Sequence, residues 1–131
     1  MINFIILLLI VPSALILLWQ RTTPCRAKRR KGQRAPDTSA VDGGIGTPNR
    51  VYFFHASYCS PCHSMIPLVD GLRRGHPNLI KVDVAIYPKL ARDFGITAIP
   101  SFITVTDGRI QGVRPGAQSE SWLRAQLGPV T

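Results

Sequence analysis

The distribution of apolar residues divides the chain into three parts. Residues from Phe4 to Trp19 are almost all apolar, with Pro12-Ser13 as the main interruption. Residues 35–49 are small, polar and rich in Gly and Pro, without an apolar period, which is typical of a linker. From residue 50 onward, short apolar runs alternate with helical patterns. The pattern predicts an apolar helix over 1–20, a basic flank and flexible linker over 21–49, and one folded domain over 50–131.

The first apolar run has the length of a membrane span. Counted from Met1, it covers about 19 residues, close to the roughly 20 that cross a bilayer as a helix, and it shows no polar face. The competing interpretation is a cleaved signal peptide. However, no Lys or Arg precedes the run, and the sequence from Trp19 to Pro24 does not resemble a cleavage site. We therefore expect an uncleaved single-pass anchor, kinked at Pro12.

The charge of the chain is concentrated just after this run. The net charge is +9, and seven of the 16 Lys and Arg residues lie between positions 21 and 34. Placement beside an apolar helix favours an anionic membrane surface over nucleic acid. The positive-inside rule then predicts that the domain lies on the cytoplasmic side, with the periplasmic side as the alternative. The flank is a stop-transfer signal or a site that recruits anionic lipid or an acidic partner. Cys25 is either a palmitoylation site or an idle thiol.

The folded domain is predicted to alternate strands and helices. A strand, a helix and a second strand in succession imply a parallel pair. Asp107-Gly108 is a strong hairpin signal and adds two antiparallel strands, while Ser119 is a candidate N-cap of the last helix. The fold class is therefore α/β, with a mixed sheet covered by helices. The expected strands are Arg50–Ala56, Asn78–Val84, Ser101–Thr106 and Arg109–Arg114, and the expected helices are Ser60–Arg74, Pro88–Phe94 and Ser119–Leu127.

Two cysteines mark the candidate chemistry. Three cysteines are too few for a disulfide framework, but Cys59 and Cys62 stand three apart where a helix begins. This spacing places both side chains on one side of the first helical turn. The pair alone indicates either redox chemistry or part of a metal site.

Further motifs favour redox chemistry. Tyr58-Cys59-Ser60-Pro61-Cys62 and Ile99-Pro100-Ser101 match the Trp-Cys-Gly-Pro-Cys active site and the Ile-Pro-Thr loop of one family. On these motifs residues 50–128 resemble thioredoxin, which implies a thioredoxin-like fold with a mixed four-stranded sheet flanked by helices, here preceded by a single transmembrane helix. The same resemblance implies that Pro100 is cis. Further matches are Pro67 in the active-site helix, Lys81 and Asp83 on the central strand, and the turn glycines Gly108 and Gly116.

The resemblance also implies roles for the site residues. Cys59 and Cys62 would form a redox-active disulfide. Cys59 would be the nucleophile, since free backbone N–H groups at a helix N-terminus stabilise a thiolate, and Cys62 would resolve the mixed disulfide. Pro61 suits the first helical turn, where its missing N–H is not needed. The contact surface for substrate would include Tyr58, the backbone of Ile99, and Pro100.

The sequence departs from the family in ways that bear on the chemistry. The family's first strand and helix are missing, so the domain is either a shorter core or has a partly structured linker. Phe53 replaces a buried aspartate that is thought to assist proton transfer at the second cysteine, which predicts a slow resolving step. His55 replaces a tryptophan and either substitutes for that base or is simply packed. Lys81 is either a buried charge that tunes the site or a strand-end cation, and His63 either tunes a thiol or is exposed.

Together these features predict a membrane-anchored thiol–disulfide oxidoreductase. It would reduce or exchange protein disulfides through its Cys-Ser-Pro-Cys dithiol, using no cofactor. Electrons would come from a thioredoxin-reductase-like or membrane donor, with the bilayer contacted through residues 1–20 and no nucleic-acid partner. The first alternative is a redox-inert thioredoxin-fold binding module. The second is a metal site formed by Cys59, Cys62 and a histidine. It is disfavoured because structural metal sites usually have four protein ligands and because Pro100 would crowd the metal.

Overall fold

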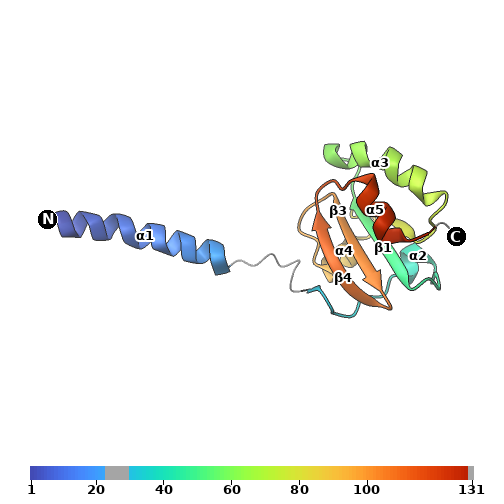
Figure 1. Cartoon of the computed structure of the whole chain (residues 1–131), viewed down its shortest axis with the longest axis horizontal. Coiled ribbons are helices and arrows are strands. Elements are labelled where there is room, and N and C mark those ends of the chain that lie inside the picture. The colour runs from blue at the N-terminus through green and yellow to red at the C-terminus, as the bar shows by residue number, and fades with distance from the viewer. Residues whose placement is uncertain (23–29, 130–131) are drawn as a thin grey trace.

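The computed structural model describes residues 1–22 and 30–129. Figure 1 shows a long N-terminal helix and an α/β domain built around one sheet. Cys25 and three cations of the basic flank, Arg26, Lys28 and Arg29, lie outside the described residues. The elements are α1 (Ile2–Thr22), α2 (Ser39–Asp42), β1 (Asn49–His55), α3 (Ser60–Arg73), β2 (Leu79–Asp83), α4 (Pro88–Phe94), β3 (Ser101–Thr106), β4 (Arg109–Pro115) and α5 (Glu120–Leu127).

Helix α1 has the length and composition of a membrane span. The 18 residues Ile2–Trp19 have a mean hydropathy of 2.6, and none of them is buried against the rest of the protein. A signal sequence would have the same properties. Pro12 lies inside the helix, which continues on both sides of it. The Ser13 hydroxyl donates to the carbonyls of Leu9 and Ile10 at 2.9 Å, so its polar group is satisfied within the helix itself.

The sheet confirms the predicted mixed topology. Its strand order is β2-β1-β3-β4, with β1 parallel to β2 and the other two pairs antiparallel. Asp107 and Gly108 join β3 to β4 with φ values of 51° and 74°. Positive φ at both central residues is the geometry that matches the right-handed twist of a two-residue hairpin. The Asp-Gly signal in the sequence thus corresponds to this turn.

Strand β1 lies inside the sheet and is buried on both faces. Its residues 51–54 are at most 1 % exposed, which explains the continuous apolar run in the sequence. Val51 and Phe53 belong to a core cluster that α3 and α5 cover. Tyr52 and Phe54 belong to a second cluster, covered by α4. The sheet therefore lies between two helical layers, as in Figure 1.

Residues 30–48, which we call the strap, pack against the domain. The sequence favoured a flexible linker over most of this range, with a partly structured linker as the alternative, and the structure shows the latter. The Gly32 N–H donates to the Ile110 carbonyl at 2.6 Å, and the Ala35 N–H donates to the Gly108 carbonyl at 2.8 Å. Backbone bonds of this kind extend the sheet beyond the outer edge of β4.

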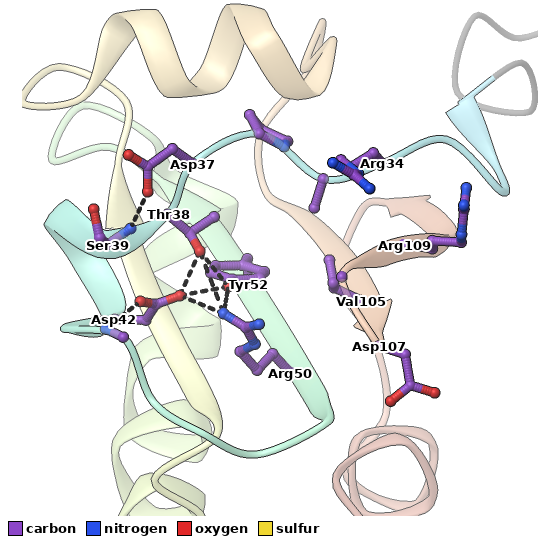
Figure 2. Close-up of a pocket in the computed structure, with 14 residues that line it drawn as sticks. Arg34, Asp37, Thr38, Ser39, Asp42, Arg50, Tyr52, Val105, Asp107 and Arg109 are labelled. Atoms are coloured by element: carbon purple, nitrogen blue, oxygen red, sulfur yellow. Dashed lines mark hydrogen bonds and ion pairs between the residues drawn. The ribbon is translucent and has the colours of Figure 1, made fainter.

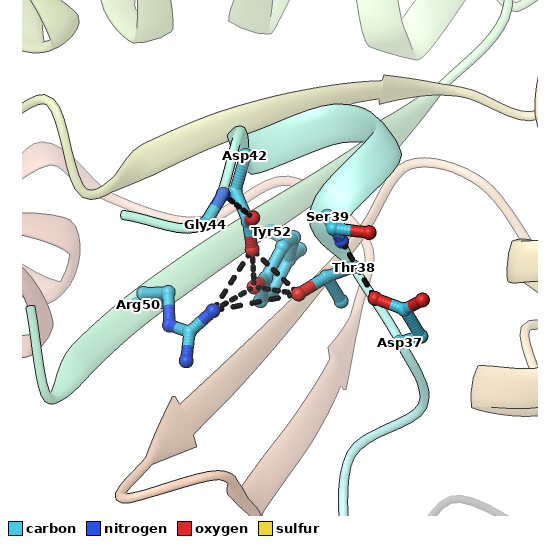
Figure 3. Close-up of polar contacts among 7 residues, drawn as sticks. All are labelled: Asp37, Thr38, Ser39, Asp42, Gly44, Arg50 and Tyr52. Atoms are coloured by element: carbon cyan, nitrogen blue, oxygen red, sulfur yellow. Dashed lines mark hydrogen bonds and ion pairs between the residues drawn. The ribbon is translucent and has the colours of Figure 1, made fainter. Parts of the chain in front are cut away.

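A buried polar network holds the second half of the strap (Figure 3). The Asp42 carboxylate accepts hydrogen bonds from Thr38 at 2.5 Å, from Tyr52 at 2.8 Å and from Arg50 at 2.9 Å. Burial alone would raise the pKa of Asp42, but these bonds and one from the Gly44 N–H hold it below its usual value. Burial raises the pKa of Tyr52 to about 12, so its hydroxyl remains a donor at neutral pH. The network ties α2 to β1.

Candidate functional site

The two cysteines of the motif stand at the beginning of α3. Cys59 is the N-cap residue in an extended conformation, and its Sγ accepts a hydrogen bond from the Cys62 N–H at 3.3 Å. Pro61 lies in the first turn, where no helical partner for an N–H is available. The Cys59 sulfur therefore lies at the positive end of the helix, an environment that stabilises a thiolate.

The cysteines are joined by a disulfide and differ in exposure. Their Cα atoms are 5.3 Å apart. Cys59 is 7 % exposed and Cys62 is fully buried. Of the two cysteines, Cys59 is therefore the more accessible to an incoming disulfide.

The loop before β3 completes the surface around the disulfide. The Ile99–Pro100 peptide bond is cis, as the resemblance implied. The Gly116 N–H donates to the Pro100 carbonyl at 2.7 Å, which ties this loop to the end of β4. Ile99 is partly buried against the cluster that contains both cysteines. The structure thus brings together Cys59, Cys62 and the predicted Ile-Pro loop from segments almost forty residues apart.

Beneath the disulfide the core is aromatic. Phe53 is fully buried in the same cluster as both cysteines. Its ring stacks on Phe102 with a centroid separation of 4.9 Å and on His55 at 5.3 Å. The position of the family's buried aspartate thus holds a hydrocarbon side chain with no proton-accepting group. The sequence analysis missed Phe102, for which the only signal was its place directly after the Ile-Pro-Ser loop.

His55 is half-buried at the end of β1. Burial lowers the pKa of its imidazole below the ordinary value. The carboxylate of Asp83, paired with His55 across β1 and β2, opposes that effect, while the ammonium of Lys81 adds to it. A lowered pKa keeps the ring neutral at pH 7, and a neutral imidazole is able to accept a proton. Its stacking on Phe53 places it beside the aromatic residues that share the buried cluster with the cysteines.

The other predicted residues lie around this centre with separate contacts. Lys81 pairs with Asp70 of α3 at 3.1 Å, and its side chain is 25 % exposed, so it is a partly solvated cation. The His63 ring lies 2.7 Å from the Ser57 carbonyl and stabilises the loop before Cys59. Tyr58 is 75 % exposed, which leaves a large apolar ring next to the disulfide.

A cavity of about 520 Å³ lies at the other end of β1 (Figure 2). Arg50, Asp42 and the turn residue Asp107 are among its lining residues, and neither cysteine is. Asp42 is fully engaged by Thr38, Tyr52 and Arg50. Because this carboxylate is occupied by residues that hold the strap, we interpret the cavity as a consequence of strap docking and not as a reaction site.

Comparison with known proteins identifies one family. A model of the family described as Thioredoxin matches residues 47–128. Thioredoxin Y2 of Arabidopsis thaliana chloroplasts is 35 % identical over 72 residues, which cover 50 % of this chain and 43 % of that protein. Thioredoxin of Alicyclobacillus acidocaldarius is 32 % identical over 80 residues, which cover 59 % of this chain and 76 % of that protein.

The solved structures agree with this fold. A thioredoxin variant from Halobacterium salinarum superimposes with a TM-score of 0.61 over 75 % of this chain and 91 % of its own, at 23 % identity. The chain spans about half the length of several curated relatives that it matches. The shared region is therefore the domain that carries the disulfide.

Proposed function

Since the chain belongs to the thioredoxin family, we propose that it is a membrane-anchored thiol–disulfide oxidoreductase acting on protein disulfides. The observation that carries this proposal is the Cys59–Cys62 disulfide at the N-terminus of α3, next to cis-Pro100. A slightly exposed first cysteine, a fully buried second cysteine and a helix N-terminus together supply the groups that disulfide exchange needs.

The reaction proceeds by two thiolate attacks. In the reduced protein, the Cys59 thiolate attacks one sulfur of a substrate disulfide, forms a mixed disulfide and releases the other substrate sulfur as a thiolate. Cys62 then loses its proton and attacks the Cys59 sulfur, which frees the second substrate thiolate. Two electrons pass to the substrate, two protons are taken up by its thiolates, and the protein is left with the Cys59–Cys62 disulfide.

The second attack is the slower one in this proposal. Cys62 is fully buried and has the Phe53 ring in its cluster, so no carboxylate replaces the missing aspartate there. Burial without a nearby base raises the cost of forming the Cys62 thiolate. Water or the neutral imidazole of His55 would take the proton instead.

Substrate binding follows from the shape of the surface around Cys59. Tyr58 offers an exposed aromatic ring, and Ile99 packs against the cluster of both cysteines while its backbone lies before β3 and outside that strand. An extended polypeptide is able to pair with such free backbone groups while its cystine sulfur faces Cys59. The substrates are therefore protein disulfides, and a thioredoxin-reductase-like or membrane protein would return the electrons.

Anchoring is the second half of the proposal. Helix α1 is long and apolar enough to span a bilayer, and the cations that follow it support an orientation with the domain in the cytoplasm. If the domain faces a periplasm instead, its electrons must cross the membrane. A compartment-sensitive reporter fused to the C-terminus distinguishes the two, and signal only outside would overturn the cytoplasmic assignment.

Trapping of the intermediate tests the redox function. The full chain in detergent, reduced beforehand, is mixed with a protein disulfide and quenched with acid at intervals. Cys62→Ser should accumulate a mixed disulfide through Cys59, and the unmodified chain should show the same species transiently because its resolving step is slow. Cys59→Ser should form none. A chain that never forms the mixed disulfide, yet binds the substrate, would instead be a redox-inert binding module.

A further inference from the structure

The chain between α1 and the domain is short. Helix α1 ends at Thr22. Among the described residues that follow it, the first side-chain bond to the domain is made by Arg30, whose Nη1 donates to the Asp93 carbonyl at 2.7 Å. Only the seven residues 23–29 separate these points. Even a fully extended chain spans at most about 3.6 Å per residue, so the anchor and the strap are at most about 30 Å apart. If α1 spans a bilayer, the domain lies close to its surface.

The strap determines which side of the domain is nearest to the anchor. Its first residues run along β4: the Ile110 N–H donates to the Gln33 carbonyl at 2.9 Å, and Arg34 forms a bridge with Arg109. Strand β4 is the last strand of the sheet, on the side away from β2. The seven-residue connection therefore joins the domain where the end of α4, bonded by Arg30, adjoins this edge, and the edge is the part of the sheet closest to the anchor.

This edge carries exposed cations. We call Lys31, Arg34, Arg109 and Arg114 the basic edge, and all four are exposed. Figure 2 shows Arg34 of the strap beside Arg109 of β4. Lys31 and Arg114 line a shared cavity of about 560 Å³ together with Trp122 of α5.

The cations of the basic edge have no carboxylate partners among the described residues. The ion pairs among those residues are Asp42–Arg50, Asp70–Lys81, Asp93–Lys89 and Glu120–Arg124, and none of them includes a cation of the basic edge. Arg109 donates to the Gly32 carbonyl, and the Arg114 guanidinium lies 5.0 Å from the centre of the Trp122 ring. Two exposed acids lie on this side, Asp107 in the adjoining turn and Asp37 in the strap, and both line a cavity with Arg34 and Arg109. The four cations therefore leave a net charge of +2.

We propose that the basic edge binds the headgroups of anionic phospholipids and so fixes the orientation of the domain on the membrane. This inference rests on the anchoring part of the proposed function. Uncompensated Lys and Arg side chains held near an anionic leaflet are attracted to it over about a Debye length. The disulfide adjoins the Arg114 end of β4, because Gly116 is bonded to Pro100. Cys59 would then face disulfides close to the membrane surface.

A native fluorophore allows a direct test. The chain has two tryptophans, so Trp19→Phe leaves Trp122 as a single probe beside Arg114 and the Lys31 cavity. The oxidised full chain is placed in nanodiscs that contain a headgroup spin-labelled lipid as quencher. The bilayer is either phosphatidylcholine alone or a mixture with phosphatidylglycerol. We expect quenching of Trp122 to be at least twofold stronger in the anionic bilayer.

Two controls separate lipid binding at this edge from general charge. Lys31→Gln/Arg34→Gln/Arg109→Gln should reduce quenching in the anionic bilayer to the level in the neutral one. The matched variant Arg74→Gln/Lys89→Gln/Arg92→Gln removes the same charge from α4 and the end of α3 and should leave the difference intact. In the chain with its basic edge unchanged, about 1 M salt, where the Debye length is about 3 Å, should abolish the difference.

The outcomes distinguish this inference from the proposed function. A chain that stays in the nanodisc but shows equal quenching in both bilayers, or loses the difference equally in both triple variants, overturns the basic edge and leaves the anchor intact. A chain that does not enter the nanodisc at all overturns both the anchor and the orientation. Disulfide exchange in detergent should be the same in every variant, because none of the substituted residues contacts Cys59 or Cys62.

Discussion

At the scale of single residues, the site combines a polar N-terminal turn with an apolar floor. The Cys59 sulfur accepts a hydrogen bond from a backbone N–H of the helix. Phe53 and Phe102 stack on each other in the buried cluster that also contains both cysteines. A polar environment favours the thiolate of Cys59, and an apolar one opposes that of Cys62. The two thiols therefore differ more in the stability of their thiolates than their three-residue spacing alone suggests.

This difference predicts unequal alkylation of the reduced protein. At pH 7 and limiting iodoacetamide, we expect Cys59 to be modified at least tenfold faster than Cys62, because a thiolate at a helix N-terminus reacts faster and is more accessible. Peptide mass spectrometry of the quenched protein gives both rates. Equal rates would contradict the assignment of Cys59 as nucleophile.

His55 predicts a pH dependence of stability. Its pKa is lowered in the folded protein relative to about 6.5 in the unfolded chain. Between the two pKa values the unfolded state therefore binds more protons than the folded state. The stabilisation present above pH 6.5 is lost as the pH falls through the folded-state pKa. In urea unfolding from pH 8 to 5, His55→Gln should lose less stability than the unmodified chain. His63→Gln, at an exposed position, is the matched control.

The same residue is also a candidate proton acceptor for Cys62. If His55 takes that proton, His55→Ala should shift the pH profile of thiol reactivity and prolong the mixed disulfide. A profile that is unchanged for both cysteines would leave His55 as a packing residue, stacked on Phe53.

At the scale of elements, the strap and its network replace the family's first strand and helix. Asp42 has 1 % of its side chain exposed and receives three side-chain hydrogen bonds, two of them from β1. A buried carboxylate with this many donors stabilises the fold only while its partners remain in place. Docking of α2 therefore depends on this one side chain.

Asp42→Asn should destabilise the domain by roughly 3 kcal/mol, at the lower end of the range for breaking a buried pair. Arg50 keeps 20 % of its side chain exposed, and water will satisfy part of its charge. Urea unfolding measures the change. Asp93→Asn removes the same charge from an exposed pair with Lys89 and should cost less than about 1 kcal/mol. Equal losses in both variants would show that the network contributes no more than a surface pair.

The elements also show which features the sequence was able to predict. Pro88–Phe94 and Ser101–Thr106 were predicted with their observed bounds, since Gly95 and the Asp107-Gly108 turn end them. Ser119 is confirmed as an N-cap, because its hydroxyl accepts the Trp122 N–H at 3.2 Å. These features depend on local chemistry, within a few residues of one another.

The strap was harder to predict because its partners are distant. Its Gly and Pro content is that of a flexible linker, and bonds to Gly108, Arg109 and Ile110, more than seventy residues away, hold it against β4. The stacking of Phe53 on Phe102 was hard to predict for the same reason, because the two rings meet only when β1 and β3 pair. The sequence revealed that an aspartate was missing, but not which side chains surround the position.

At the scale of the whole molecule, a short connection joins a candidate membrane helix to a redox domain. Residues 23–29 limit the distance that the domain can move from an anchor. Such a connection raises the effective concentration of the domain near disulfides in the same membrane and excludes disulfides far from it.

Lengthening this connection should change activity selectively. A Gly/Ser insertion of about 30 residues after Ala27 widens the space that the domain samples, since the span of a flexible linker grows with the square root of its length. We expect slower reduction of a membrane-anchored disulfide protein in the same proteoliposomes, and an unchanged rate with the soluble form of that protein. Equal rates with both forms would show that the short connection has no role in substrate choice.

The hydrogen bonds between the strap and β4 have one more consequence. An outer strand with free N–H and C=O groups is a template on which another chain can add a strand, and this leads to aggregation. Confinement to a membrane would raise the frequency of collisions between copies of the domain. Residues 32–35 already occupy the groups of Gly108 and Ile110 on that side. The segment that connects the domain to its anchor thus also blocks the edge at which neighbouring copies would otherwise stick together.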